Sequence, residues 1–325
     1  MKEKILKLFQ SLREKGLSLF GKCADGISRL KPKATGFLSK WWRLAAVGIF
    51  VLPVLYYPAG ALIVHRIDTN PDFSGTNNAV QTIGTLEALI HRETGVHIFT
   101  PNKPFFHPAA VLDDVPAFQT GVISGIKNAV EAFQSANSPS EKLQEAAERL
   151  AYPADVWHIS KWKPAVSSVK KYRKARTKLA EYQQNVSNGT ETFDRSPKAL
   201  SIILSRLEKD IRNCVGTLAG QIGKSDSGSD DVFYQVKGQA YAYYLVLRDL
   251  KKDFEPEFAR ENLEKERQNV LSFLQNAIRM KPFFVMNGKP DSQTIPNHLT
   301  GMGFYLSRAA FGLNEMKEEL QAEHE

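Results

Sequence analysis

The chain is 325 residues long and carries a formal net charge of +8, but this charge is unevenly distributed. Residues 1–43 contain eleven Lys or Arg and three Asp or Glu, which leaves 32 residues of each sign in the rest of the chain. Because this large remainder is charge-balanced, the basic excess does not indicate nucleic-acid binding. The length is sufficient for one or two globular domains.

Two interpretations of the basic tail, residues 1–43, stay open. Ile5, Leu8 and Leu12 recur at helical spacing between lysines and arginines, which is typical of an amphipathic helix on a membrane surface. Three glycines between positions 16 and 26 equally fit a disordered tail. In either case we expect the tail to stay in the cytoplasm, because short segments rich in Lys and Arg are retained there.

Residues 44–64 form the most apolar segment of the chain. Over 21 positions they contain no Asp, Glu, Lys, Arg or His, and a helix of this length spans the roughly 30 Å hydrocarbon core of a bilayer. Trp41, Trp42 and Arg43 precede the segment and suit the membrane interface. We therefore predict a single transmembrane helix. A cleaved signal peptide is disfavoured, because the basic region is too long and the apolar run continues past the small residues at 59–61.

This topology predicts four parts: a cytosolic tail at 1–43, the transmembrane helix at 44–64, a polar spacer at 65–77 and a periplasmic helical domain at 78–325. Cys23 and Cys214 are the two cysteines of the sequence, and they are expected on opposite sides of the membrane. A disulfide within the chain is therefore not expected, and the domain has to be held together by its core.

A helix is expected over residues 78–91, followed by an irregular stretch over residues 94–116. One glycine and four prolines interrupt this stretch, so it cannot continue as a helix. It is nevertheless too apolar for a solvated loop, because it contains Val96, Ile98, Phe99, Phe105 and Phe106. We therefore predict an extended strap that packs across the helical domain.

From residue 114 onward the pattern is helical almost to the C-terminus. Asp113 or Asp114 is expected to cap the first of these helices, and Ser138-Pro139 and Ser196-Pro197 are further start signals. Apolar residues recur at steps of three and four, as in helices packed lengthwise: Leu200, Leu204, Leu207, Ile211, Cys214 and Leu218, then Val236, Ala240, Tyr243, Leu247 and Leu250, then Leu299, Met302, Leu306, Ala309, Leu313, Met316 and Leu320. The sequence predicts an all-α fold, an antiparallel helical bundle with one Pro-rich strap.

The sequence contains no motif for a metal, a cofactor or a catalytic nucleophile. Its histidines lack ligand spacing. Several carboxylates lie beside apolar residues and leave a wall-modifying hydrolase open as an alternative: Asp113, Asp114, Glu87 and Asp155. A helix cap and the polar face of a helix explain these carboxylates more simply, so catalysis is not expected.

Two irregular stretches, residues 102–108 and 287–298, combine aromatic and amide side chains. A bundle requires neither stretch, and apolar loops of this kind are often used for binding. The hypothesis is that both close one end of the domain and that six residues line a shared groove there: Asn102, Phe105, Phe106, Asn287, Asn297 and His298. The competing explanation is that both stretches only plug the end of the bundle.

Four long blocks carry a resemblance to a known family: residues 102–121, 172–195, 233–254 and 285–309. Together they are similar to a bacterial inner-membrane family that is known only as a domain of unknown function. The resemblance implies a bacterial source and a periplasmic domain, and it supplies no catalytic residues. We expect a membrane-anchored scaffold without a cofactor, whose partners are the lipid bilayer and another envelope protein. The alternatives are the hydrolase and an accessory subunit of a transport or secretion complex.

Overall fold

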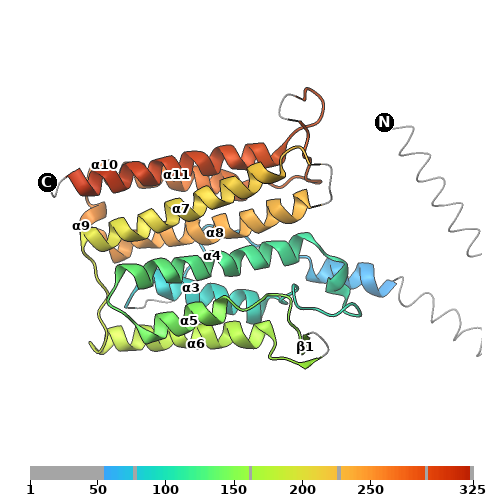
Figure 1. Ribbon diagram of the computed structural model, residues 1–325, viewed down its shortest axis with the longest axis horizontal. Helices are drawn as coiled ribbons and strands as arrows, with labels where there is room; N and C mark the ends of the chain where they lie inside the picture. Colours follow the sequence, from blue (N-terminus) through green and yellow to red (C-terminus); the bar gives the residue numbers. More distant parts are fainter. Residues whose placement is uncertain (1–54, 76–78, 161–162, 225–227, 290–291, 323–325) are drawn as a thin grey trace, which may run out of the picture. The chain divides into compact units, whose positions relative to one another are not determined.

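The computed structural model describes residues 55–75, 79–160, 163–224, 228–289 and 292–322 (Figure 1). The chain divides into two compact units, Met1–Tyr56 and Tyr57–Glu325. Predictions for the basic tail, and for Trp41, Trp42 and Arg43 at its end, lie outside the described residues. Of the apolar segment, residues 44–54 also lie outside them, and residues 55–64 are helical. Within the described ranges, no helix combines the length and the hydropathy needed to cross a bilayer.

The unit Tyr57–Glu325 is mostly helical, which confirms the all-α class of the predicted fold. Its long elements are α3 (Gln81–His91), α4 (Asp114–Ala136), α5 (Glu141–Leu150), α6 (Ser168–Ser187), α7 (Pro197–Gln221), α8 (Ser229–Asp253), α10 (Glu261–Arg279) and α11 (His298–Ala322). The short elements are a π-helical turn η1 (Arg92–Val96), a 3-10 turn η2 (Pro108–Val111), the helix α9 (Glu255–Phe258) and an antiparallel pair of two-residue strands, β1 (Ile159–Ser160) and β2 (Lys163–Pro164).

The helices lie side by side with their axes roughly aligned (Figure 1). α10 and α11 form one edge, α7 and α8 follow, α3 and α4 come next, and α5 and α6 form the opposite edge. Most neighbouring helices are antiparallel, as predicted, but α4 and α8 run parallel at the centre. Gly121 faces Gln235 near the start of both helices, and Asn128 donates to the Tyr243 hydroxyl farther along (2.9 Å). Periodicity identifies the buried face of each helix but not its neighbour, so this parallel pair was not predicted.

The predicted apolar stripes form the core of the bundle. All residues predicted on the stripes of α7, α8 and α11 are buried. The start signals hold in two cases, because Asp113 caps α4 and Ser196 caps α7, with Pro197 in the first turn. In the third case the helix begins later than predicted, because Ser140, and not Ser138, accepts the capping bond from Leu143 (3.3 Å). Side-chain caps therefore account for these helix starts.

Helix α3 begins without a capping side chain of its own, since Val80 precedes it. The cap comes from the end of α8: the Asp253 carboxylate accepts hydrogen bonds from the amides of Gln81 (2.7 Å) and Thr82 (2.9 Å). The C-terminal end of α3 continues into η1 instead of stopping at His91. Thr94 and Gly95 thus belong to the π turn, and the irregular strap begins later than predicted.

The strap packs on the bundle only in part, which corrects the prediction: Thr100, Asn102 and Ala109 are buried, but most of its large apolar side chains are not. Phe99 is buried, but Val96, Ile98, Phe105 and Phe106 are exposed, Phe105 to 83%. The reason is local: the prolines turn the chain back on itself at residues 104–107, where the amide of His107 bonds to the carbonyl of Pro104 (2.9 Å). The two phenylalanines at the tip of this turn therefore point away from the core.

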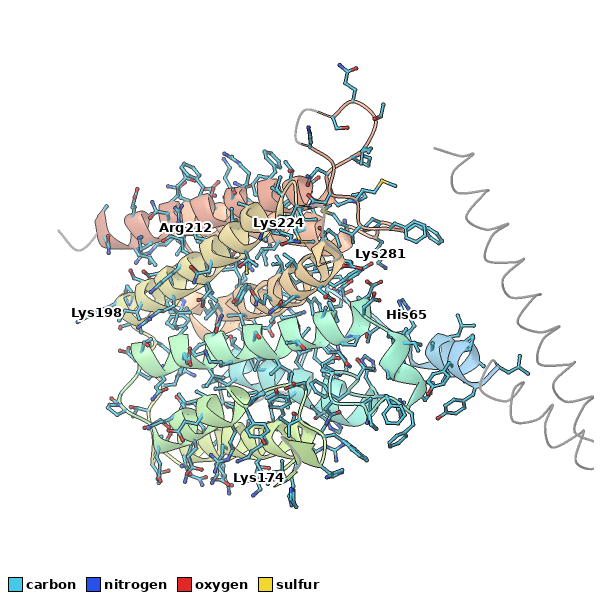
Figure 2. All side chains as sticks on the ribbon, turned by 45° about the vertical axis from the view of Figure 1, so that its right-hand side comes forward. His65, Lys174, Lys198, Arg212, Lys224 and Lys281 are labelled. Atoms are coloured by element: carbon cyan, nitrogen blue, oxygen red, sulfur yellow. The ribbon has the colours of Figure 1, made fainter. Side chains whose placement is uncertain are left out.

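The two ends of the bundle differ. At one end, here called the loop end, lie the strap (residues 97–113), the segment with the small strands (151–167), the connection after α7 (222–228) and the loop between α10 and α11 (280–297). Figure 2 places His65, Lys224 and Lys281 at this end and Lys198 at the other. The opposite end, the turn end, has mostly shorter connections, at residues 137–140, 188–196 and 259–260. Irregular backbone is thus concentrated where residues 57–64 join the bundle.

Candidate functional site

The loop end is the candidate site because it exposes aromatic side chains on backbone that is firmly held. Large apolar side chains are normally removed from water, so a group of them on the surface marks a contact site. Four phenylalanines stand out, in two adjacent pairs on different loops: Phe105 and Phe106, and Phe283 and Phe284.

The first pair occupies the tip of the strap, in the sequence Lys103-Pro104-Phe105-Phe106. The two rings meet edge to face with centroids 5.5 Å apart, and Phe106 also meets the edge of Trp157 (5.7 Å). Tyr57 donates its hydroxyl hydrogen to the carbonyl of Phe105 (2.9 Å). The tip is therefore fixed on one side to the helix that carries Tyr57.

The second pair follows α10, in the sequence Lys281-Pro282-Phe283-Phe284. Phe283 is 91% exposed and Phe284 68%, and their rings meet edge to face at 4.6 Å. Just before them, the buried Lys237 of α8 donates to the carbonyl of Met280 (2.6 Å). Just after them, the amide of Met286 donates to His298 Nδ1 (2.8 Å). The rings are exposed, but the backbone on both sides of them is anchored.

The same tetrapeptide, Lys-Pro-Phe-Phe, thus occurs at residues 103–106 and 281–284, both times at the loop end. The first pair of phenylalanines was predicted as part of a binding surface, whereas the second pair was not predicted. The repetition of the tetrapeptide was the available signal.

The six residues predicted to share a groove fall into separate sets of contacts. Asn297 donates to Asn287 Oδ1 (3.0 Å), and Asn287 donates to the carbonyl of Gln221 (2.8 Å), so these amides tie the α10–α11 loop to the end of α7. His298 belongs to the same loop through its bond from Met286. Asn102, in contrast, is a buried residue of the strap itself and donates to the carbonyl of Val156 (3.3 Å), while Phe105 and Phe106 contact each other. The shared groove stays a prediction, and the amides have structural bonds of their own.

An acidic cleft of about 490 Å³ lies between the starts of α4 and α8 at the loop end. Asp113, Asp155 and Asp231 line it. Burial, together with the charges of Asp230 and Asp113, raises the pKa of Asp231, and burial together with Asp113 raises the pKa of Asp114. Two of the predicted carboxylates, Asp113 and Asp155, are therefore brought together, along with Asp231, which was not predicted.

Of the other two predicted carboxylates, Asp114 follows Asp113 in the first turn of α4, whereas Glu87 lies elsewhere. Glu87 pairs with Arg176 on the outer face of α3 and α6 (3.2 Å), as expected for a residue on a polar helix face. No three His, Cys, Asp or Glu side chains of the described ranges are arranged to hold a metal ion.

A buried polar cluster lies beside the strap, on η1. Arg92 is paired with Glu93 (2.8 Å) and donates to the Tyr241 hydroxyl (2.9 Å), and Glu93 accepts from Gln119 (3.1 Å). Gln119 also accepts from the amide of Thr100 (2.8 Å). This chain of bonds connects α3, α4 and α8 to the start of the strap, so we assign it a structural role.

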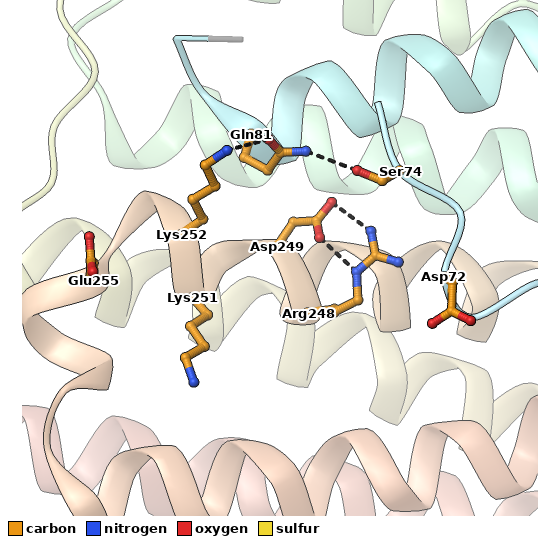
Figure 3. A pocket seen from close by; sticks show the side chains of 8 residues that line it. All are labelled: Asp72, Ser74, Gln81, Arg248, Asp249, Lys251, Lys252 and Glu255. Atoms are coloured by element: carbon orange, nitrogen blue, oxygen red, sulfur yellow. Dashed lines mark hydrogen bonds and ion pairs between the residues drawn. The ribbon is translucent and has the colours of Figure 1, made fainter. Parts of the chain in front are cut away.

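A second cleft, of about 710 Å³, opens on the side of the bundle between α8 and the spacer before α3 (Figure 3). Its three cations already have partners within the chain. Arg248 pairs with the neighbouring Asp249 (2.7 Å), Lys251 with Glu264 of α10 (2.8 Å), and Lys252 donates to Gln81 (3.2 Å). These internal partners already occupy the cations in part, so the side cleft is a weaker candidate than the loop end.

The fold and the exposed loop end define an all-helical bundle protein with an aromatic surface at one end. Residues 226–322 match the family model described as "Uncharacterized protein conserved in bacteria (DUF2333)". The matched stretch includes α10, α11 and the loop with the second tetrapeptide. The expected resemblance to an uncharacterized bacterial family is thereby confirmed. No curated protein and no solved structure matches the chain.

Proposed function

We propose that the protein is a membrane-anchored scaffold of the bacterial cell envelope, held in the inner membrane by residues 44–64. In this proposal the basic tail is cytoplasmic and the helical bundle lies in the periplasm. The bundle binds another envelope protein and holds it close to the membrane. Catalysis is not part of this proposal.

The observation that supports the proposal most is the position of residues 57–64. They are the last part of the apolar segment, and Leu62 and Ile63 are each about 80% exposed on their helix. This helix reaches the bundle at the loop end, where Gly60 packs on Pro108. A helix with exposed aliphatic side chains is expected where lipid, and not water, surrounds it.

Reporter fusions test the topology. Alkaline phosphatase, which is active only outside the cytoplasm, should be active when fused after Glu325 and inactive when fused after Lys40. A cytoplasmic fluorescent reporter at the same two positions should give the opposite pattern. Activity of the phosphatase after Lys40, with none after Glu325, would reverse the topology.

Cross-linking in native membranes tests the scaffold role. A photo-reactive residue at the turn end, for example in place of Lys198, and one at the loop end, in place of Lys224, should capture different neighbours identified by mass spectrometry. Capture of an intact transporter or secretion complex would favour the accessory-subunit alternative. Absence of a reproducible protein neighbour at both positions would contradict the scaffold.

The acidic cleft supports one second candidate function, a wall-modifying hydrolase. A glycosidase needs a carboxylic acid with a raised pKa beside a second carboxylate. Asp231 has a raised pKa, and Asp113 is a second carboxylate in the same cleft. Purified full-length protein should then release muropeptides from peptidoglycan, and Asp231→Asn should abolish this release. Lack of release by the unmodified protein would exclude this candidate for peptidoglycan.

A further inference from the structure

We propose that the two Lys-Pro-Phe-Phe tips are membrane-seating elements: each inserts its pair of phenylalanine rings into the outer face of the bilayer that holds the apolar segment. The inference rests on the proposed membrane anchor and goes beyond it, because it assigns a second membrane contact to the folded domain itself. The ligand is the lipid surface, and the recognising groups are four phenylalanines and the two lysines that precede them.

The hydrogen bond to Tyr57 fixes the position of the first tip along the apolar helix. Tyr57 precedes Val64, the end of the apolar segment, by seven residues, which corresponds to about 10 Å along a helix. Tyr57 donates to the carbonyl of Phe105, and Gly60 packs on Pro108. The strap therefore lies alongside the last two turns of the apolar helix and not beyond them. If that helix crosses the bilayer with Val64 at the edge of the hydrocarbon core, the tip of the strap lies about 10 Å inside that edge, level with the outer part of the acyl chains.

The chemistry of the tips suits this depth. Aromatic rings are stable at the boundary between headgroups and acyl chains, and a neighbouring lysine can reach lipid phosphate with its ammonium group. At the first tip, the bond from His107 to Pro104 satisfies polar groups of the backbone within the turn, which lowers the cost of leaving water. Proline removes one further backbone donor from each tip.

The fastening of the second tip supports the same role. Lys237 holds Met280 before the rings, and His298 holds Met286 after them. Met286 is itself 42% exposed, and Lys281 is exposed beside Phe283. The rings are thus presented to the outside by an anchored loop. Acidic groups lie nearby at the starts of α4 and α8, namely Asp113, Asp114, Asp230 and Asp231. Insertion of the two tips into the bilayer should therefore depend on the phenylalanine rings more than on the content of anionic lipid.

Spin labels on single cysteines test the inference in the full-length protein, reconstituted in nanodiscs of phosphatidylethanolamine and phosphatidylglycerol. Cys23 is replaced by Ser, whereas the buried Cys214 can stay, because burial raises the pKa of its thiol to about 12 and keeps it unreactive. Labels are placed by Phe106→Cys and Phe284→Cys. The matched control is Phe311→Cys, which is exposed on the side of α11, and Val51→Cys reports on the apolar segment.

Labels at positions 106, 284 and 51 should collide more with oxygen, which concentrates in lipid, than with a water-soluble nickel complex. The label at position 311 should show the reverse. If the labels at 106 and 284 collide mainly with the nickel complex while the label at 51 collides mainly with oxygen, the inference is overturned and the anchor stays. If the label at 51 also collides mainly with the nickel complex, the anchor is overturned as well. A label on Phe283, the most exposed ring, repeats the measurement if a variant at 106 or 284 fails to fold.

Discussion

Gly238 of α8 lies against the backbone carbonyl of Phe118 on α4, so closely that a Cβ atom at position 238 would collide with it. Gly121 makes the reciprocal approach from α4 to the carbonyl of Gln235. The central parallel pair of helices thus meets backbone to backbone. The absence of side chains at these two positions brings the starts of both helices, and the carboxylates they carry, to the same place.

Replacing Gly238 by Ala should destabilise the bundle by about 1–3 kcal/mol, because the helices must separate to admit one methyl group. The matched control is Gly216→Ala on α7, where a Cβ atom would meet nothing within 4 Å. That change should stabilise the protein by roughly 0.5–1 kcal/mol through helix propensity. Urea unfolding of the full-length protein in detergent measures both. Equal effects of the two substitutions would contradict the close approach of α4 and α8.

Lys237 should make stability depend on pH above neutrality. Burial, with a smaller contribution from Lys281, lowers the pKa of Lys237 from 10.5 to about 8. In the window between these values the unfolded chain binds a proton that the folded chain does not, so stability rises with pH. The gain between pH 7 and pH 9.5 should be about 2 kcal/mol. Lys237→Met should remove this rise, whereas the exposed control Lys198→Met should keep it.

The outcome of the Lys237 experiment is judged from the slope and not from the absolute stability. Lys237→Met relieves the cost of a buried charge but also removes the bond to the Met280 carbonyl, so its effect at a single pH has no certain sign. Parallel pH profiles of Lys237→Met and the unmodified protein would contradict the assignment of a lowered pKa to Lys237.

The Arg92–Glu93 pair should be far more sensitive than an ion pair on the surface. Glu93→Gln removes the nearer of the two carboxylates beside the buried Arg92, leaving the partly exposed Asp68 at 3.6 Å, and should cost about 3 kcal/mol. Glu87→Gln removes the partner of Arg176 on the outside of the same region and should cost less than about 1 kcal/mol. Thermal or urea unfolding distinguishes the two. Similar costs for both changes would show that the buried pair is hydrated.

The same pair predicts acid sensitivity. Burial alone would raise the pKa of Glu93, but His97, whose Nδ1 lies 3.5 Å from the carboxylate, and Arg92 together lower it below 4.5. A carboxylate with a lowered pKa stabilises the fold above the ordinary pKa, and this contribution is lost as the pH falls through the lowered value. Glu93→Gln should therefore flatten the loss of stability below about pH 4.5.

Asn287 should prove structural. Its side chain donates to the carbonyl of Gln221 (2.8 Å) and to Ser229 Oγ (3.0 Å), and it accepts from Asn297. Asn287→Ala leaves these partners unpaired and should cost about 1–3 kcal/mol. Asn269→Ala on the exposed face of α10 is the matched control and should be close to neutral. An unchanged thermal midpoint of Asn287→Ala, combined with loss of protein cross-links, would instead restore the predicted groove.

The core could be predicted from the sequence, but the candidate site only in part. Stripes such as Leu200–Leu204–Leu207 report burial directly, because a helix repeats its buried face at steps of three and four. The strap was misjudged for a physical reason: apolar composition shows that Phe105 should avoid water, but it does not show whether protein or lipid covers the ring. The acidic cleft depends on Asp113 and Asp231, residues far apart in the chain that only the parallel pairing of α4 and α8 brings together.

The loop end and the turn end are separated by the length of the helices, which sets the distance between the two ends of the bundle. Helix α11 begins at the loop end and continues for 25 residues, which is about 37 Å along its axis. If the loop end rests on the bilayer, the turns beside α9 and between α6 and α7 stand roughly that far above the lipid. The bundle would then act as a rigid spacer that holds a protein bound at the turn end at a fixed distance from the membrane.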